Sequence, residues 1–170
     1  MAEVRTGAGW QLAQLNVGRP LAPMDSPRLA DFIAQLDEIN ALAEASPGFV
    51  WRLVGAGGNA TDVRTDVDPS LIVNMSVWAT AEQLFEFVYK TAHTKVMARR
   101  REWFDKIETY QVLFWIPAGH QPTVAEAMAR LALLRERGPS PEAFTFKQRY
   151  PTPGEPGAPI DLRPEPYCVP

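Results

Sequence analysis

Hydrophobic and polar residues alternate strictly along residues 71–78, a pattern that predicts a β-strand. Successive side chains of a strand point to opposite faces, so this strand has one apolar face and one mixed face. The apolar face carries Leu71, Val73, Met75 and Val77, and the mixed face carries Ile72, Asn74, Ser76 and Trp78. We therefore expect helices to pack on the apolar face, and a ligand or another protein surface to meet the amide, hydroxyl and indole of the mixed face.

Further strands and helices follow from the same kind of periodicity. Alternation predicts strands at residues 10–17, 49–54 and 110–116, and apolar stripes with a helical period predict helices that begin after Ser26, Thr80 and Thr123. Gln83 and Glu126 follow the two threonines at the spacing of a capping box. The second helix is expected to bend near residues 90–93 and then to continue to residue 107. A short edge strand is expected at residues 144–146.

The predicted order of elements is strand, helix, strand, strand, helix, strand, followed by one more helix. This βαββαβ order is typical of an α+β fold with a ferredoxin-like antiparallel sheet and both large helices on one face. The other face then needs a cover, and a second copy of the chain would provide it, giving a homodimeric α+β barrel. We expect one domain over residues 1–150 and an extended, proline-rich tail over residues 151–170.

Composition narrows the classes of partner and compartment. The net charge of −3 argues against a nucleic-acid-binding domain, which would be basic. No apolar run approaches the ~18 residues that a membrane span requires. The one cysteine, Cys168, cannot form a disulfide within the chain, so the expected location is the cytoplasm.

Seven short segments stand out along the chain: 13–16 (AQLN), 47–52 (PGFVWR), 73–78 (VNMSVW), 87–89 (FVY, with His93), 101–104 (REWF), 113–120 (LFWIPAGH) and 138–146 (GPSPEAFTF). Together they resemble domain-of-unknown-function family 3291, over about residues 10–150. That family is similar to the dimeric α+β barrel superfamily, which includes cofactor-free antibiotic biosynthesis monooxygenases, haem-degrading monooxygenases, muconolactone isomerases and ligand-binding regulators. The resemblance thus implies a fold rather than one reaction.

The resemblance implies catalytic roles for Asn16, Asn74 and Trp78, because the cofactor-free monooxygenases have asparagines and a tryptophan facing the barrel interior. Amide and indole N–H groups in a dry pocket could stabilise a phenolate, a carbanion oxygen or a peroxy intermediate. The alternative is that the amides bond to loop backbone and the indole is part of the core.

His93 falls on the helical segment that carries an axial histidine in related haem enzymes, so the resemblance allows a haem ligand there. A general acid or base is a second role, because the ordinary pKa of histidine suits neutral pH. A packing or hinge residue is the third. His93 and His120 lack the third ligand of a catalytic zinc site, so no metal is expected.

Arg100 shares a helical stripe with Trp103 and is our candidate for binding an anionic substrate group. A solvated basic face is the alternative for this stretch, which also contains Arg99 and Arg101. Trp103 and other polar or aromatic side chains are predicted to contact substrate; these are Gln14, Arg52, Ser76 and Tyr89.

These observations favour a small-molecule enzyme without a cofactor. The leading hypothesis is a monooxygenase or isomerase that acts on an aromatic or polyketide-like substrate. The alternatives are a non-catalytic protein that binds a small ligand or a partner, and a haem-binding monooxygenase that uses His93.

Overall fold

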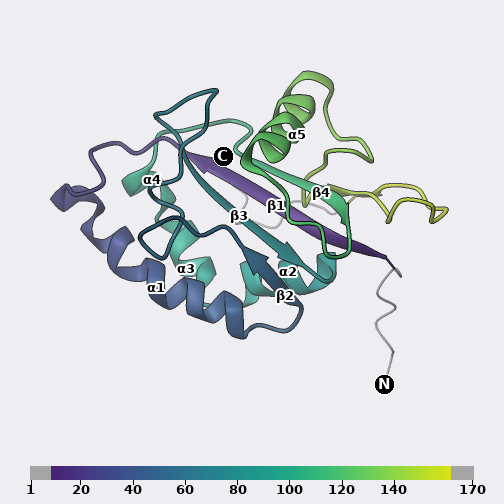
Figure 1. Cartoon of the computed structure of the whole chain (residues 1–170), viewed down its shortest axis with the longest axis horizontal. Helices are drawn as coiled ribbons and strands as arrows, with labels where there is room; N and C mark the ends of the chain where they lie inside the picture. The colour runs from purple at the N-terminus through teal and green to yellow at the C-terminus, as the bar shows by residue number, and fades with distance from the viewer. Residues whose placement is uncertain (1–8, 162–170) are drawn as a thin grey trace.

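A computed structural model describes residues 9–161, which form a four-stranded antiparallel sheet covered by helices on both faces (Figure 1). The strands lie in the order β2-β3-β1-β4, the order of a ferredoxin-like sheet. The predicted α+β class and the predicted succession of elements are therefore confirmed. The elements are β1 (Trp10–Gly18), α1 (Ala30–Ala45), β2 (Phe49–Arg52), β3 (Ile72–Trp78), α2 (Ala81–Lys90), α3 (His93–Ala98), α4 (Arg100–Trp103), β4 (Gln111–Pro117) and α5 (Val124–Arg137).

The predicted helix starts are confirmed by their hydrogen bonds. The Thr80 hydroxyl accepts from the backbone N–H of Gln83 at 3.2 Å, and the Thr123 hydroxyl accepts from that of Glu126 at 3.1 Å. After Ser26, a short 3-10 turn (Pro27–Leu29) leads into α1. The bend expected near residues 90–93 is a complete break, because α2 ends at Lys90 and α3 begins at His93. The helical path also ends earlier than predicted, at Trp103.

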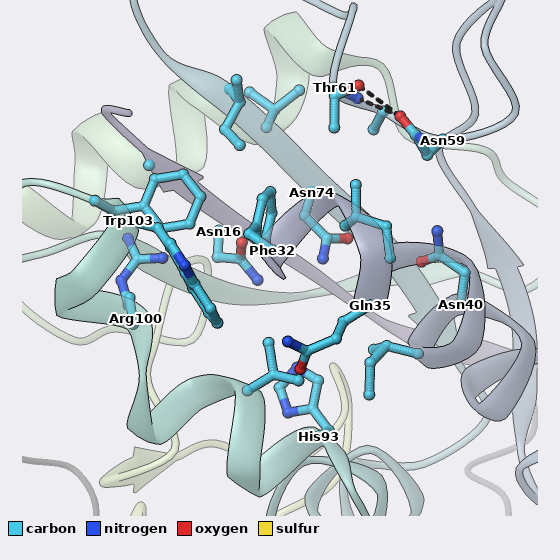
Figure 2. A pocket seen from close by; sticks show the side chains of 18 of the residues that line it. Asn16, Phe32, Gln35, Asn40, Asn59, Thr61, Asn74, His93, Arg100 and Trp103 are labelled. Carbon is cyan, nitrogen blue, oxygen red and sulfur yellow. Dashed lines mark hydrogen bonds between the residues drawn. The ribbon is translucent and has the colours of Figure 1, made fainter. Parts of the chain in front are cut away.

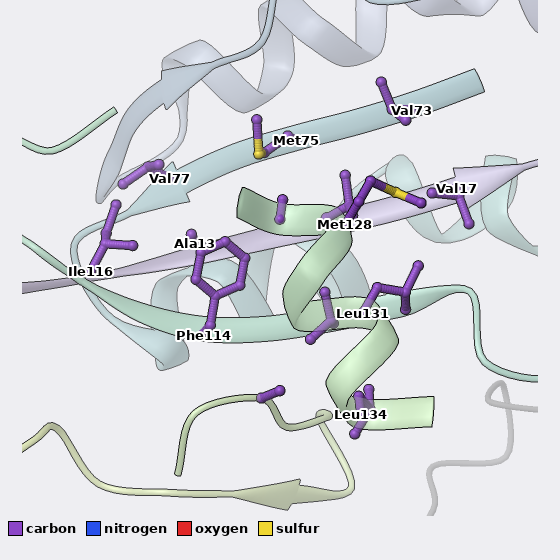
Figure 3. Packing of buried hydrophobic residues seen from close by; sticks show 14 of the residues in the cluster. Ala13, Val17, Val73, Met75, Val77, Phe114, Ile116, Met128, Leu131 and Leu134 are labelled. Atoms are coloured by element: carbon purple, nitrogen blue, oxygen red, sulfur yellow. The ribbon is translucent and has the colours of Figure 1, made fainter. Parts of the chain in front are cut away.

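The apolar face of the sheet packs against α5, the last helix (Figure 3). Val73, Met75 and Val77 of β3 are at most 3% exposed and belong to one cluster with Met128 and Leu131 of α5. Our expectation that these three side chains face the first two large helices is wrong. Strand parity assigns side chains to two faces, but it does not say which helices cover which face.

The mixed face lies under α1, α2, α3 and α4 (Figure 1). Pairing of β1 with β3 places its residues in three successive rungs, Leu12 opposite Trp78, Gln14 opposite Ser76 and Asn16 opposite Asn74. The first rung is fully buried, the second is buried and polar, and in the third Asn74 is exposed. The polar character of this face therefore increases along the strands toward one end of the sheet.

Residues 144–161 lie along the β4 edge and near α2. The predicted strand at 144–146 is a single bridge between Phe144 and Leu113, with backbone hydrogen bonds of 2.8 and 2.9 Å. The Trp115 indole N–H donates to the Tyr150 carbonyl at 3.0 Å. β5 (Gln148–Arg149) then pairs with β6 (Ile160–Asp161), which lies within the predicted tail, to form a two-stranded sheet. Residues 162–170, the end of the predicted tail, lie outside the described residues.

Helices of the same chain cover both faces of the sheet. We expected a second copy because the mixed face was left bare, but α1–α4 cover that face and α5 covers the other one. The homodimer stays a prediction. Within residues 9–161, no helix has the length and apolar character that crossing a membrane demands.

Candidate functional site

A cavity of about 110 Å³ lies between the mixed face of the sheet and the helices α1, α3 and α4 (Figure 2). Its walls also include part of the loop between β2 and β3. It opens to solvent, since Asn74 on its β3 wall is exposed. An engineered cavity of about 150 Å³ in another protein holds benzene, so this space suits a molecule with about one ring.

Asn16 and Asn74 form the sheet wall of the cavity. The two residues are directly opposite each other in the antiparallel pairing of β1 and β3, so their side chains leave the sheet side by side. Asn16 donates one amide N–H to Gln14 Oε1 over a long 3.5 Å, and no hydrogen bond involves the Asn74 amide among the described residues. Both amides therefore keep donor and acceptor capacity for a ligand.

His93 begins α3 and lines the opposite side of the cavity from Asn74 in the view of Figure 2. Its Nδ1 lies 3.4 Å from the Val88 carbonyl oxygen. A carbonyl only accepts hydrogen bonds, so Nδ1 carries the proton and Nε2 carries a lone pair in the neutral ring. Burial lowers the pKa of His93 below its ordinary value. The imidazole is therefore neutral at pH 7, with Nε2 able to accept a proton.

Arg100 begins α4 and is largely enclosed. Its guanidinium lies 4.2 Å from the centre of the Tyr110 ring and 5.2 Å from that of Phe104, and Nη2 donates to the Val17 carbonyl at 2.6 Å. Burial lowers the pKa of Arg100, although a guanidinium remains charged. Among residues 9–161, no carboxylate lies within ion-pair distance of Arg100.

Arg52 is the other charged group of the cavity wall, and its charge is compensated. Its Nε donates to Glu44 Oε1 of α1 at 2.7 Å, and its two terminal nitrogens both lie 3.3 Å from the Gly58 carbonyl. The side chain thus ties the β2–β3 loop to α1. This role is structural, and it fixes the loop residues Asn59 and Thr61 at the cavity rim.

Four of the predicted site residues do not line the cavity. Trp78 is fully buried in the core, stacked on Phe87, and its indole N–H donates to Ser76 Oγ at 2.9 Å. Ser76 also accepts from Gln14 Nε2 at 3.2 Å. Tyr89, a residue of α2, packs against Phe85 and Phe146. The cause is the rung order, since the Trp78 and Ser76 rungs lie closer to α2, where the helix packs tightly on the sheet.

The structure brings together Asn16, Arg52, Asn74, His93, Arg100 and Trp103 of the predicted set. It adds side chains that sequence reasoning did not assign to a site. Those with polar groups are Gln35 and Asn40 of α1 and Asn59 and Thr61 of the loop, and the apolar ones include Phe32 of α1. Asn40 did carry a signal, because an amide within the apolar stripe of a helix needs a partner.

The described residues of the cavity do not fit a metal ion or haem. Within residues 9–161, no group of three histidine, cysteine or acidic side chains is arranged to hold a metal ion. Haem does not fit, because a cavity of about 110 Å³ is far smaller than a macrocycle of four pyrrole rings. The geometry therefore does not support His93 as a haem ligand.

Comparison with known proteins identifies a family. The family model described as "Domain of unknown function (DUF3291)" matches residues 11–158. No curated protein matches the chain. A conserved protein from Methanosarcina mazei Go1 has a similar structure, with 10% identity and a TM-score of 0.45 over 62% of this chain and 90% of that one.

Two further solved structures are similar to this chain. A protein of unknown function from Nitrosomonas europaea has 15% identity and a TM-score of 0.42, over 69% of this chain and 97% of that one. A candidate antibiotic biosynthesis monooxygenase from Chloroflexus aurantiacus J-10-fl has 14% identity and a TM-score of 0.37, over 67% of this chain and 98% of that one. Because these sequence identities and TM-scores are low, the three structures do not indicate a function for this chain.

Proposed function

Because the chain belongs to the DUF3291 family, whose name specifies no reaction, we propose a function on the basis of the cavity. The protein would be a small-molecule enzyme that starts its reaction by removing a proton from the substrate. The observation that carries this proposal is the position of His93, which lines the cavity with its Nδ1 3.4 Å from the Val88 carbonyl oxygen. Its Nδ1–H is directed to the Val88 carbonyl, so the lone pair of Nε2 is left for a substrate proton.

The groups around His93 suit the anion that proton removal creates. The proton would come from a phenolic O–H or from a C–H beside a carbonyl group. The resulting oxyanion would accept hydrogen bonds from the amides of Asn16 and Asn74, and Arg100 would supply the compensating positive charge. Preorganised donors of this kind stabilise charge at the point where it develops, which is where they accelerate a reaction most.

Two reactions share this first step. An isomerase returns the proton from His93 to another carbon of the same anion. A cofactor-independent monooxygenase lets the carbanion react with O₂, which converts a CH₂ group to C=O and releases one water. In both, the substrate itself supplies the electrons, so no metal or flavin is required. The size of the cavity favours a substrate with one ring over a polycyclic one.

Ligand binding without catalysis is the second candidate function. The observation that favours it is the excess of carboxamides, since Asn16, Gln35, Asn40, Asn59 and Asn74 all line the cavity. Carboxamides recognise a ligand by hydrogen bonding but do not transfer protons near neutral pH. The two candidates differ in whether Nε2 of His93 ever takes the proton of the ligand.

An isotope-exchange experiment separates the two. Single-ring phenols, and cyclic monoketones whose C–H beside the carbonyl exchanges slowly without a catalyst, are incubated with the protein in D₂O, with and without O₂. Loss of the C–H signal is followed by NMR together with oxygen consumption. We expect exchange or turnover that is lost in His93→Gln, since general base catalysis typically contributes about 10²–10⁴-fold. His120→Gln is the matched control, because His120 pairs with Glu126 at the exposed start of α5, outside the cavity.

Two results would contradict catalysis. One is exchange at equal rates in wild type and His93→Gln. The other is tight binding of these compounds with no exchange and no oxygen consumption, which would favour the binding protein.

A further inference from the structure

The charged groups of the cavity are unlike those of the chain as a whole. The protein has 20 acidic and 17 basic residues, with a net charge of −3. The cavity wall contains two arginines and no aspartate or glutamate among the described residues. An acidic protein with an acid-free, arginine-containing cavity has concentrated positive potential at that point, and such potential attracts anions.

Arg100 is the source of that potential, because no carboxylate of residues 9–161 serves as its counterion. A buried charge normally has a partner of opposite sign, since removing an ion from water is costly. Arg100 has a carbonyl and two aromatic rings instead, as described above. A guanidinium has five N–H donors, and the one bond to Val17 leaves most of them for another acceptor.

The arginine before Arg100 shows that carboxylates lie close to this segment. Arg99 binds Asp31 Oδ2 at 3.0 Å and Glu102 Oε2 at 2.8 Å. Arg101 is exposed to solvent. Of the three consecutive arginines, Arg100 alone lines the cavity.

We propose that the cavity binds a small monocarboxylate, with the carboxylate on Arg100 and an apolar ring or short chain against Phe32, Val96 and Trp103. The proposal deepens the proposed function and relies on it only for the choice of this cavity as the ligand site. A carboxylate is favoured because its two oxygens match the fork of a guanidinium. The apolar walls and the volume of about 110 Å³ then admit a hydrocarbon part of about one ring.

The arrangement would also orient the substrate within the cavity. Figure 2 shows Arg100 beside Trp103 at one side of the cavity, with His93 on the opposite side from Asn74. A carboxylate fixed at Arg100 would hold the rest of the ligand along the wall that contains the two asparagines, toward His93. The charge would thus position the substrate, and the proton would be removed elsewhere on the molecule.

Binding of benzoate and benzamide tests this proposal directly, because the two have the same shape and differ in charge. Isothermal titration at pH 7 should show benzoate binding at least tenfold more tightly than benzamide. Hydrogen bonds to a charged group are worth about tenfold to a hundredfold in affinity, so Arg100→Met should remove that preference. Arg101→Met, one residue along and exposed, is the matched control and should keep it. Inorganic phosphate, the charge-only probe, should bind more weakly than benzoate.

The proposal is overturned if benzamide binds as well as benzoate, if phosphate binds as well as benzoate, if Arg100→Met keeps the preference, or if benzoate does not bind at millimolar concentration. The wild-type comparison needs no variant, so it stands even if Arg100→Met unfolds. His93→Gln separates this proposal from the proposed function. This variant should lose proton exchange and still bind benzoate. Benzoate binding by a wild-type protein that shows no exchange would support the carboxylate site and contradict catalysis. Exchange of neutral substrates without a carboxylate preference does the reverse.

Discussion

On one face of the sheet, side chains of β1, β3 and β4 such as Met75 and Phe114 pack under α5 with no exposed surface. On the other face, the same strands present Asn16 and Asn74 to an open cavity under α1, α3 and α4. The difference arises at single-residue spacing, because neighbouring positions of a strand alternate between the two faces. The α5 face is therefore core throughout, whereas the mixed face combines a second core cluster with the proposed ligand site. Adjacent residues around that site should give opposite results when they are changed.

Truncation of the α5 face should have the largest effect. Phe114 is fully buried in the cluster with α5, so Phe114→Ala removes a ring from a packed core and should lower the free energy of unfolding by about 3–5 kcal/mol. Urea unfolding followed by tryptophan fluorescence measures the change. A loss below about 1 kcal/mol would mean that α5 does not pack closely on the sheet.

Removal of an amide from the cavity should instead affect the ligand. Asn74→Ala should reduce affinity or turnover by about tenfold to a hundredfold, the value of a hydrogen bond of about 1.5–3 kcal/mol to a charged group. Its stability should stay within about 0.5 kcal/mol of wild type, because the side chain is exposed and has no partner among the described residues. Val73→Ala, the adjacent control, should cost about 1–3 kcal/mol of stability and leave the ligand response intact. If the two variants lose stability equally and ligand response is unaltered, the site assignment is wrong.

A substitution of Trp78 tests whether this residue belongs to the core, as its burial indicates, or to the cavity. Trp78→Phe deletes the indole N–H that donates to Ser76 and should destabilise the fold by about 1–2 kcal/mol, without changing ligand affinity. Thermal unfolding and ligand titration on the same sample measure both quantities. A loss of turnover at full stability would return Trp78 to the catalytic role that the family resemblance implies.

The pH dependence of stability gives the smallest effect and concerns His93. Its pKa is lowered by burial in the folded state, so the unfolded chain binds a proton more readily. The stability of the folded state is thus full above the ordinary pKa of about 6.5, and it decreases as pH falls toward the lowered pKa, with a slope of at most about 1.4 kcal/mol per pH unit. The difference between wild-type and His93→Gln unfolding energies from pH 7.5 to 5 isolates this contribution. A flat difference would mean that His93 is solvated.

Much of the fold could be predicted from local patterns. Alternation located all four main strands, and the threonine caps located the starts of α2 and α5, because these signals depend on neighbours within a few residues. The packing of α5 could not be predicted in the same way. Its stripe shows that it covers an apolar surface, but the choice between the two faces depends on the path of the chain after β4.

The site could be predicted in part, for the same reason. Parity put Asn16, Asn74 and Trp78 on one face correctly. It did not reveal that α2 buries Trp78, whereas a cavity separates α1 from Asn74. The distance between a helix and a sheet depends on side chains from distant segments. Asn59 and Thr61 come from a loop without periodicity, so no pattern in the sequence pointed to them.

The most direct test of the account is a ¹⁵N NMR titration of the two imidazole rings, with His120 as the internal reference. The account predicts that at pH 7 His93 is neutral with the proton on Nδ1, that it titrates below the ordinary value of about 6.5, and that its Nε2 resonance shifts when benzoate is added. His120, outside the cavity, should show no shift on benzoate addition. A His93 ring that is protonated at pH 7, or that carries its proton on Nε2, or whose Nε2 resonance does not move while the ligand binds, would contradict it.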